Sequence, residues 1–323
     1  MNFAVIGTNF ISDNFADAVK KTDGAKITAV YSRAEKTGSD FAEKHGGEIK
    51  IFTSYERMLS EGGFDAVYVA SPTVLHAIHS IKALESGYHV LCEKMMAATL
   101  EDFYLMKSAA QSSGRVLLEA MRPSFDPAYV AIRNNLSRIG KIRRACLTFC
   151  QYSSRYDRFK SGILTNAFDP KMKNSALSDI GIYPLNIAVS LFGEPMDISS
   201  ASVFLENGFE AEGASTLAYS DKIVSVIYSK INDSFSPSVI EGEDGAILID
   251  KLTQPSAVEL KLRSGMKEII YAAEETNNMV YEIDSFMKMC SGGLDFRPYL
   301  LITEKTQVLV DKIYGITDTY KRF

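Results

Sequence analysis

Three polar side chains have the types and spacing that could interconvert an alcohol and a carbonyl group. Lys94 comes directly after Glu93 at the end of an apolar run, 88–92. A lysine in this position can donate to a substrate oxygen and stabilise negative charge that develops on it. Asp179 and Tyr183 are four residues apart at the start of an expected helix, so they can share a face. A tyrosine can move the proton in this chemistry, and a nearby ammonium group favours its phenolate form.

Each of these groups also has an ordinary structural explanation. Lys94 and Glu93 could be a surface pair at a strand end. Asp179 could cap a helix, where its charge suits the N-terminal dipole, while Tyr183 packs in a core. The types and spacing alone therefore leave both interpretations open.

A glycine-poor version of a nucleotide-binding loop follows the first apolar run, 3–6. Residues 7–12 stand where a G-x-G-x-x-G fingerprint would, with only its first glycine present. Gly7 permits the tight strand-to-helix turn, and Asn9 suits a positive φ in place of the central glycine. Amides that follow can face a pyrophosphate at the helix N-terminus. The residues predicted to bind there are Gly7, Thr8, Asn9, Phe10 and Ile11. An ordinary turn between strand and helix is the alternative.

The end of the second apolar run, 27–31, indicates which dinucleotide would bind. Enzymes that use NAD usually carry a carboxylate there, about 20 residues beyond the glycine loop. This chain has Ser32 and Arg33 instead, with Lys36 close behind. Arginine presents a planar fork that matches a 2′-phosphate. These residues favour NADP(H) over NAD(H), with a solvated basic loop as the alternative.

Apolar runs that alternate with helical patterns predict the elements that position these groups. Strands are expected at 3–6, 27–31, 49–52, 66–70, 88–92 and 116–119, with helices between them. This alternation predicts an N-terminal Rossmann domain with a doubly wound parallel sheet, over residues 1–122. From about residue 142 the pattern becomes β-rich, and the alternation at 223–230 is typical of a half-buried antiparallel strand, so residues 123–323 predict a second, α+β domain with a mainly antiparallel sheet. A C-terminal helix at about 303–314 is expected to pack back on the first domain.

The order of these pieces resembles the glucose–fructose oxidoreductase / inositol dehydrogenase / MocA (Gfo/Idh/MocA) family. Residues 70–94 are similar to the family pattern T/S-P-N-x-x-H followed by A-L-x-x-G-K-H-V-x-x-E-K-P. Residues 179–186 resemble D-x-G-x-H/Y-x-x-D/N, and 241–245 resemble E-G-x-x-G. The resemblance covers essentially the whole chain. It implies that the sheet of the second domain is large and open, and that this domain serves substrate binding and oligomerisation. It implies that Lys94 is the catalytic lysine and that Asp179 and Tyr183 lie in the acid/base region. It also implies nucleotide contacts from a further group of residues: Ser71, Pro72, His76 and Glu93.

Position 183 is tyrosine rather than histidine. In this respect the chain resembles the branch of the family that contains dimeric dihydrodiol dehydrogenase, D-xylose dehydrogenase and glucose–fructose oxidoreductase. In that branch the tyrosine is the proposed proton donor and NADP is the usual cofactor. Three residues depart from the family pattern. Met95 replaces the proline after Glu-Lys, Asn9 replaces a loop glycine, and Thr73 replaces an asparagine. None of these changes removes a group that the chemistry needs.

The composition and the N-terminal pattern argue against several other classes of protein. The 323 residues carry a formal net charge of -5, which argues against nucleic-acid or anionic-membrane partners. No stretch approaches the roughly 20 apolar residues of a membrane helix, and the N-terminus lacks a signal-peptide pattern. The four cysteines show no CxxC spacing, which fits a reducing, cytoplasmic setting, and the four histidines suggest no metal site.

The sequence therefore predicts an NADP-dependent oxidoreductase acting on a small hydroxylated or carbonyl substrate, such as a sugar, polyol or dihydrodiol. A homodimer or homotetramer through the open sheet is expected. A non-catalytic dinucleotide-binding regulator on the same fold is the main alternative, suggested by the altered loop and Met95. A hydrolase that uses a nicotinamide transiently is a third, which Tyr183 disfavours because such family members generally carry histidine there.

Overall fold

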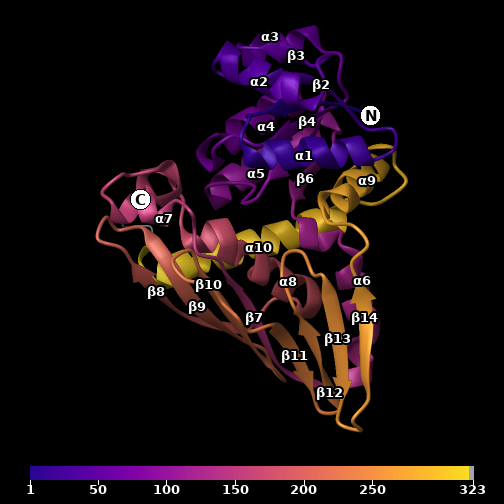
Figure 1. Cartoon of the computed structure of the whole chain (residues 1–323), viewed down its shortest axis with the longest axis vertical. Helices are drawn as coiled ribbons and strands as arrows, with labels where there is room; N and C mark the ends of the chain where they lie inside the picture. Colours follow the sequence, from indigo (N-terminus) through magenta and orange to yellow (C-terminus); the bar gives the residue numbers. More distant parts are fainter. Residues whose placement is uncertain (320–323) are drawn as a thin grey trace. The chain divides into compact units, whose positions relative to one another are not determined.

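The computed structural model describes residues 1–319 and divides the chain into two compact units (Figure 1). The first unit consists of Met1–Met121 and Asn277–Leu301. The second consists of Arg122–Thr276 and Ile302–Phe323, of which 320–323 lie outside the described residues. The predicted ranges, 1–122 and 123–323, differ from these units near the C-terminus. Residues 277–301 belong to the first unit, whereas the helix expected at 303–314 lies in the second.

A six-stranded sheet forms the centre of the first unit, and all of its neighbouring strands are parallel. The strands, in order across the sheet, are β3 (Lys50–Phe52), β2 (Lys26–Tyr31), β1 (Asn2–Ile6), β4 (Ala66–Val69), β5 (His89–Glu93) and β6 (Leu117–Ala120). The strand order reverses between β1 and β4, where open α/β sheets bind their ligands. The predicted doubly wound parallel sheet is confirmed.

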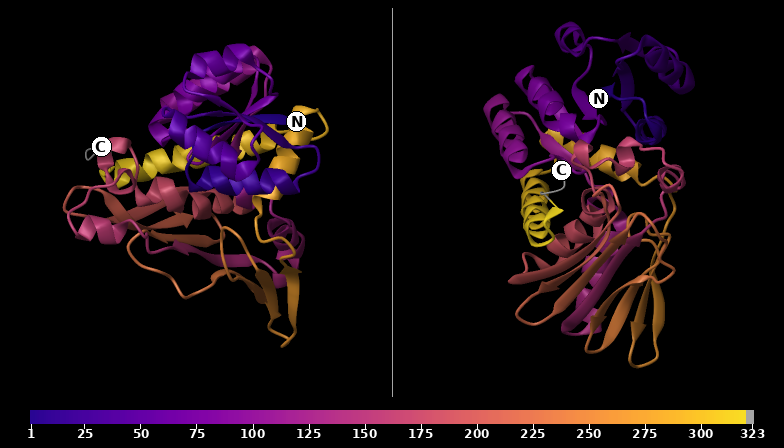
Figure 2. Two further views of the ribbon diagram at one scale, coloured as in Figure 1. Left: turned by 45° about the horizontal axis from the view of Figure 1, so that its top comes forward. Right: turned by 90° about the vertical axis from the view of Figure 1, so that its left-hand side faces the viewer.

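Helices cover both faces of this sheet (Figure 2). They are α1 (Phe10–Lys21), α2 (Glu35–His45), α3 (Tyr55–Glu61), α4 (His76–Glu85), α5 (Leu100–Ser113) and α9 (Met279–Cys290). Every residue of β4 is buried, as a continuous apolar strand between two helical layers should be. Helix α9 joins this unit because Phe286 packs on Phe3, with ring centroids 6.1 Å apart. The sequence alone did not place α9 here.

The second unit contains an eight-stranded sheet whose neighbouring pairs are antiparallel except β7 and β10. In order across the sheet the strands are β14 (Lys267–Ala272), β13 (Ala257–Leu262), β12 (Gly245–Ile249), β11 (Ser238–Gly242), β7 (Ile142–Cys150), β10 (Ile223–Ser229), β9 (Glu210–Ala218) and β8 (Asp197–Phe204). The predicted mainly antiparallel sheet is confirmed, but the edge strand β14 was not predicted.

One face of this sheet is buried. Its side chains alternate along the strands, as Val224, Val226 and Tyr228 do on β10. Helix α8 (Ile182–Phe192) packs on this face against β7 and β10 (Figure 1). A π-helical segment, Leu177–Gly181, precedes α8 directly. The remaining α-helices of the unit are α6 (Pro127–Asn135), α7 (Tyr156–Lys160) and α10 (Arg297–Ile316), which begins in the first unit.

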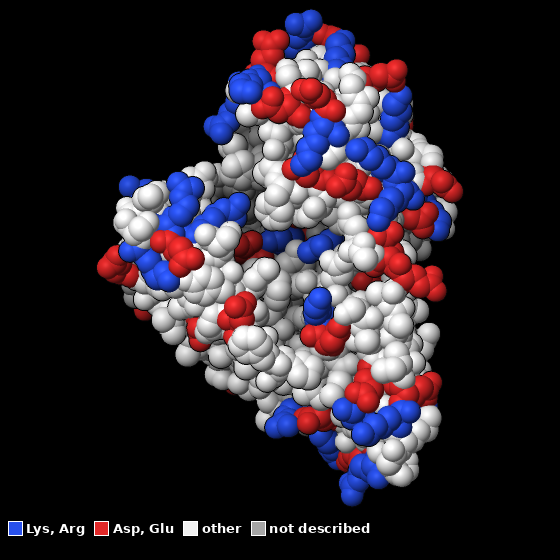
Figure 3. Space-filling model, in the orientation of Figure 1, with Lys and Arg blue, Asp and Glu red and all other residues white. Residues whose placement is uncertain are grey.

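Charged side chains of both signs are mixed over the face of the first unit seen in Figure 3. Such mixing produces no broad field of one sign on that face. Among residues 1–319, no helix combines the length and apolar character needed to cross a bilayer.

Candidate active site

The turn between β1 and α1 depends on Gly7. Its φ is +94°, a conformation that L side chains rarely adopt. A Cβ at this position would lie 2.7 Å from the carbonyl oxygen of Ala70, which follows β4. The Gly7 amide donates to the Tyr31 carbonyl at the end of β2, with a distance of 3.2 Å. Gly7 therefore holds the turn against the carboxyl ends of two neighbouring strands.

Asn9 does not have the backbone conformation expected of a residue that replaces a loop glycine. Its φ is −90°, so it does not occupy the predicted positive-φ conformation. Its side chain instead caps α1, because Oδ1 accepts from the amides of Ile11 and Ser12 at 3.0 and 3.3 Å. Its Nδ2 donates to the Ala70 carbonyl at 3.0 Å. The Ile11 amide predicted to face a pyrophosphate is thus bonded to Asn9 in this structure.

The end of β2 presents hydroxyl groups and an exposed guanidinium. Ser32 is buried, and its hydroxyl lies 2.5 Å from that of Thr37 in α2. Arg33 is exposed beside them. Lys36 is exposed and pairs with Asp40 at 3.3 Å. No sequence pattern pointed to Thr37, because its hydroxyl comes from the helix that follows the strand end.

Lys94 follows β5 at the carboxyl edge of the same sheet and is partly exposed, whereas the methionines after it are buried. Its amide donates to the Glu93 carboxylate at 3.3 Å. Glu93 is buried and accepts from the Tyr68 hydroxyl. Glu119, at the end of β6, is also buried and accepts from the Met96 amide at 2.9 Å. Two buried carboxylates therefore hold the backbone on either side of Lys94.

His76 holds this loop in place through its two ring nitrogens. Its buried ring lies between two carbonyl oxygens, 3.0 Å from Met95 and 2.8 Å from Ser71. Burial lowers the pKa of His76, so its neutral ring can donate to one of them at a time. The ring links the turn after β4 to the loop that carries Lys94. Nearby, burial lowers the pKa of His79 to about 4, and its Nδ1 lies 2.9 Å from the Ser71 hydroxyl.

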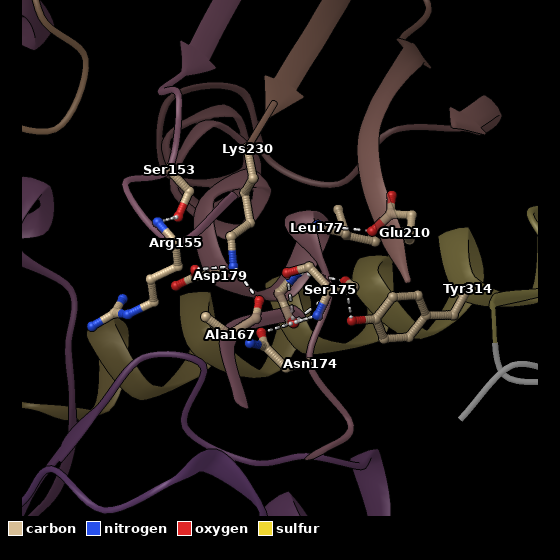
Figure 4. Close-up of polar contacts among 11 residues, drawn as sticks. Ser153, Arg155, Ala167, Asn174, Ser175, Leu177, Asp179, Glu210, Lys230 and Tyr314 are labelled. Carbon is tan, nitrogen blue, oxygen red and sulfur yellow. Dashed lines mark hydrogen bonds and ion pairs between the residues drawn. The ribbon is translucent and has the colours of Figure 1, made fainter. Parts of the chain in front are cut away.

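The second unit places Asp179 in the π-helical segment rather than in the first turn of a regular helix. Its carboxylate lies 2.8 Å from the ammonium group of Lys230, directly after β10. The two side chains point toward each other in Figure 4. Lys230 was missed by the sequence argument. It extends the inward-facing alternation that includes Val226 and Tyr228, and a lysine at such a position is a recognisable exception.

Gly181 explains why the motif around Asp179 contains a glycine. A Cβ at Gly181 would lie 2.8 Å from the Tyr228 ring and 3.0 Å from the Leu177 side chain. The missing side chain lets the π-helical segment approach β10. Tyr183 is buried at the start of α8, and its ring meets Phe149 edge-on with centroids 5.6 Å apart.

The residues of the first unit fit a nicotinamide dinucleotide. The β1–α1 turn combines a glycine at positive φ with the exposed N-terminal end of a 12-residue helix. That arrangement suits a pyrophosphate, whose charge the helix dipole stabilises. Among residues 1–319, no group of three His, Cys, Asp or Glu side chains could hold a metal ion.

Comparison with known proteins places this arrangement in a family. The protein-family model described as "Oxidoreductase family, NAD-binding Rossmann fold" (Gfo/Idh/MocA) matches residues 1–121 of this chain. The scyllo-inositol 2-dehydrogenase (NADP(+)) IolU of Bacillus subtilis is 39% identical over 90% of this chain and 88% of that protein. The chain belongs to this oxidoreductase family.

Other Gfo/Idh/MocA proteins extend the likeness. The trans-1,2-dihydrobenzene-1,2-diol dehydrogenase of Mus musculus is 24% identical, over 94% of this chain and 92% of its own. The 3-ketoreductase KijD10 of Actinomadura kijaniata, solved with NADP, has a TM-score of 0.88 over 98% of both chains, at 20% identity. That similarity shows the fold. The chain is accordingly a nicotinamide-dependent dehydrogenase or reductase.

Proposed function

We propose that this Gfo/Idh/MocA oxidoreductase uses NADP(H) to interconvert a cyclic polyol and its ketone. The 39% identity with the scyllo-inositol dehydrogenase, over 90% of the chain, carries this proposal. The Lys94 and Tyr183 positions support it, because they supply a cation and a phenol at the carboxyl end of β5 and the start of α8. Sugars and dihydrodiols remain members of the wider substrate class.

The chain's residues move the proton and stabilise charge. When bound, the nicotinamide supplies the redox chemistry by exchanging a hydride with the substrate carbon. In the reducing direction, Lys94 donates to the carbonyl oxygen and stabilises the negative charge that develops as the C–H bond forms. Tyr183 then gives its phenolic proton to that oxygen, which completes the alcohol. Asp179, four residues before Tyr183, is the third proposed catalytic residue. Oxidation reverses these steps, with the tyrosinate accepting the alcohol proton.

The proposed cofactor site extends over the carboxyl edge of the six-stranded sheet. Its proposed members are Gly7, Thr8, Asn9, Phe10, Ile11, Ser32, Arg33, Lys36, Ser71, Pro72, His76 and Glu93. The exposed guanidinium of Arg33 and the hydroxyls beside it support a 2′-phosphate. No carboxylate follows β2 before the start of α2, where a ribose-binding acid would favour NAD.

Arg33→Ala tests the preference for NADP(H). We expect it to weaken NADPH binding by about 10- to 100-fold, because a charge-assisted contact to the phosphate is lost. NADH lacks that phosphate, so its binding should change little. Titrations that follow nicotinamide fluorescence would measure both dissociation constants. Arg57→Ala, at an exposed arginine paired with Glu61, is the matched control. Equal losses for both nucleotides would overturn the assignment of Arg33.

A substrate screen tests the polyol assignment. The purified protein would be incubated with NADP⁺ and with inositols, linear polyols, aldoses and dihydrodiols, and NADPH formation would be followed by absorbance. We expect the highest kcat/KM with an inositol. A higher value with a dihydrodiol or an aldose would replace cyclic polyols with that class while leaving the oxidoreductase assignment intact.

We also propose that two or four copies associate through the outer face of the eight-stranded sheet. The outer face is the one opposite α8. On it, neighbouring strands place partly exposed side chains directly beside one another, in a row: Leu248, Val239, Cys146, Ser225 and Thr216. Such a face suits a second copy of the chain.

All four cysteines are free thiols, which supports a reducing, cytoplasmic setting.

A further inference from the structure

Lys230 is a buried cation with a defined set of contacts. Its side chain is 4% exposed. Besides Asp179, its ammonium group donates to the Ala167 carbonyl at 2.9 Å. It also lies 4.9 Å from the ring centroid of Phe168 and 5.2 Å from that of Phe209. Figure 4 shows Lys230 reaching from the end of β10 to the π-helical segment.

The two members of this ion pair differ in exposure. The Asp179 side chain is 34% exposed, so its carboxylate reaches the surface of the unit while the ammonium group does not. A buried ammonium group that loses its counter-ion is strongly disfavoured, because little water can replace the lost charge. Protonation of Asp179 would leave Lys230 in that state. The buried ammonium group of Lys230 therefore favours the carboxylate form of Asp179 beside it.

The segment that carries Asp179 is also held at its beginning. Glu210, the first residue of β9, is buried and accepts from the Leu177 amide at 2.9 Å. The Tyr228 hydroxyl donates to the same carboxyl group at 2.8 Å. Burial raises the pKa of Glu210, and these donors oppose that effect. Strands β9 and β10 thus hold the π-helical segment at Leu177 and Asp179.

A further polar contact holds the residues that directly precede this segment. The hydroxyls of Ser175 and Tyr314 lie 2.9 Å apart, and both side chains are buried (Figure 4). Ser178 closes the turn, because its hydroxyl accepts from the Ser175 amide at 3.0 Å. π-Helical turns are uncommon and occur frequently at functional sites. The segment Leu177–Gly181 places a charged residue, Asp179, beside a buried partner, Lys230.

We propose that Lys230 is a positioning residue that keeps Asp179 ionised and fixed, so that Asp179 acts as a constant negative charge. The proton of the reaction is then moved by Tyr183 and not by Asp179. This inference rests on the proposed function, because it assigns Lys230 to the same reaction. It adds a residue that neither the motifs nor the names of the relatives indicate.

A double-mutant cycle tests this inference. Lys230→Met preserves most of the side-chain volume and removes the charge. We expect it to lower kcat by about 10- to 100-fold, since small displacements of a positioned group have effects of this size. In an Asp179→Asn background the same change should alter kcat by no more than about twofold, because the partner through which Lys230 acts is gone. Lys230→Arg should retain most of the activity. NADPH binding should be unchanged throughout.

Thermal unfolding gives a second cycle that needs no substrate. Asp179→Asn leaves a buried ammonium group without its counter-ion, so it should lower Tm. Adding Lys230→Met should recover most of that loss. Lys222→Met is the matched control, since Lys222 also pairs with an aspartate and lies 5.3 Å from the centroid of a tyrosine ring. This control should leave kcat unchanged.

Three outcomes would overturn the inference. The first is an equal fall in kcat on Lys230→Met in both backgrounds, and the second is no fall in either. The third is an unchanged kcat in Asp179→Asn itself, which would also remove Asp179 from the proposed mechanism. Hydride transfer assisted by Lys94 would survive all three, because Lys94→Met tests it separately.

Discussion

Lys94→Met is expected to lower kcat on the order of 100- to 1,000-fold, the usual cost of removing one donor to a developing oxyanion. Methionine keeps the length and apolar stem of the side chain but cannot donate to oxygen. The neighbouring backbone should stay in place, because Glu93, Glu119 and His76 hold it through backbone contacts. The dissociation constant of NADPH should therefore change little. Single-turnover kinetics and nucleotide titration on the same protein would separate the two effects.

Lys82→Met is the control for this change. Lys82 lies in α4 of the same unit and pairs with Glu56 on the surface, so its loss should leave kcat unaltered. A Lys94→Met protein with undiminished turnover would contradict the proposed mechanism. A protein that lost NADPH binding as well would show that Lys94 mainly supports the nucleotide site.

Tyr183→Phe is expected to lower kcat by about 100-fold or more, the range associated with a positioned general acid or base. Phenylalanine keeps the edge-on contact with Phe149, so the start of α8 should remain packed. The pH profile is the decisive measurement. The profile of the variant should differ from that of the wild type, because the variant has no phenolic proton to move.

Tyr219→Phe provides the matched control for Tyr183→Phe. The Tyr219 hydroxyl donates to the Gly193 carbonyl at 3.0 Å, and burial raises the pKa of Tyr219 to about 12. Its removal should affect stability slightly and leave the pH profile of kcat unchanged. If Tyr183→Phe kept the wild-type profile, the proton would have to move through another group.

The sequence predicts the first unit well because its strands are covered on both faces. Runs such as 66–70 are uninterrupted apolar segments between helical patterns, and each contains a strand of the parallel sheet, such as β4. Strand β14 was missed because it lies at a sheet edge and begins with the charged pair Lys267 and Glu268. Charges on edge strands prevent unwanted pairing, but they also hide the apolar alternation that identifies a strand.

The candidate site is predictable where local chain order decides position. Gly7 and Lys94 follow strands of one parallel sheet, so their place at its carboxyl edge follows from the strands themselves. Lys230 could not be paired with Asp179 in this way, because their meeting depends on how a π-helical segment lies against β10. The role of Asn9 could not be predicted either, because it depends on local contacts of its side chain. Its side chain caps α1 at negative φ, although a residue in that loop position was expected to imitate glycine.

Transfer of isotope tests the central claim most directly. The protein would be incubated with the ketone of scyllo-inositol and with NADPH that carries transferable deuterium at nicotinamide C4, and the product would be analysed by mass spectrometry. The proposed mechanism predicts an alcohol with one deuterium on the former carbonyl carbon, formed in the same amount as NADP⁺. An alcohol without deuterium, or no alcohol from a protein that binds both NADPH and the ketone, would contradict it.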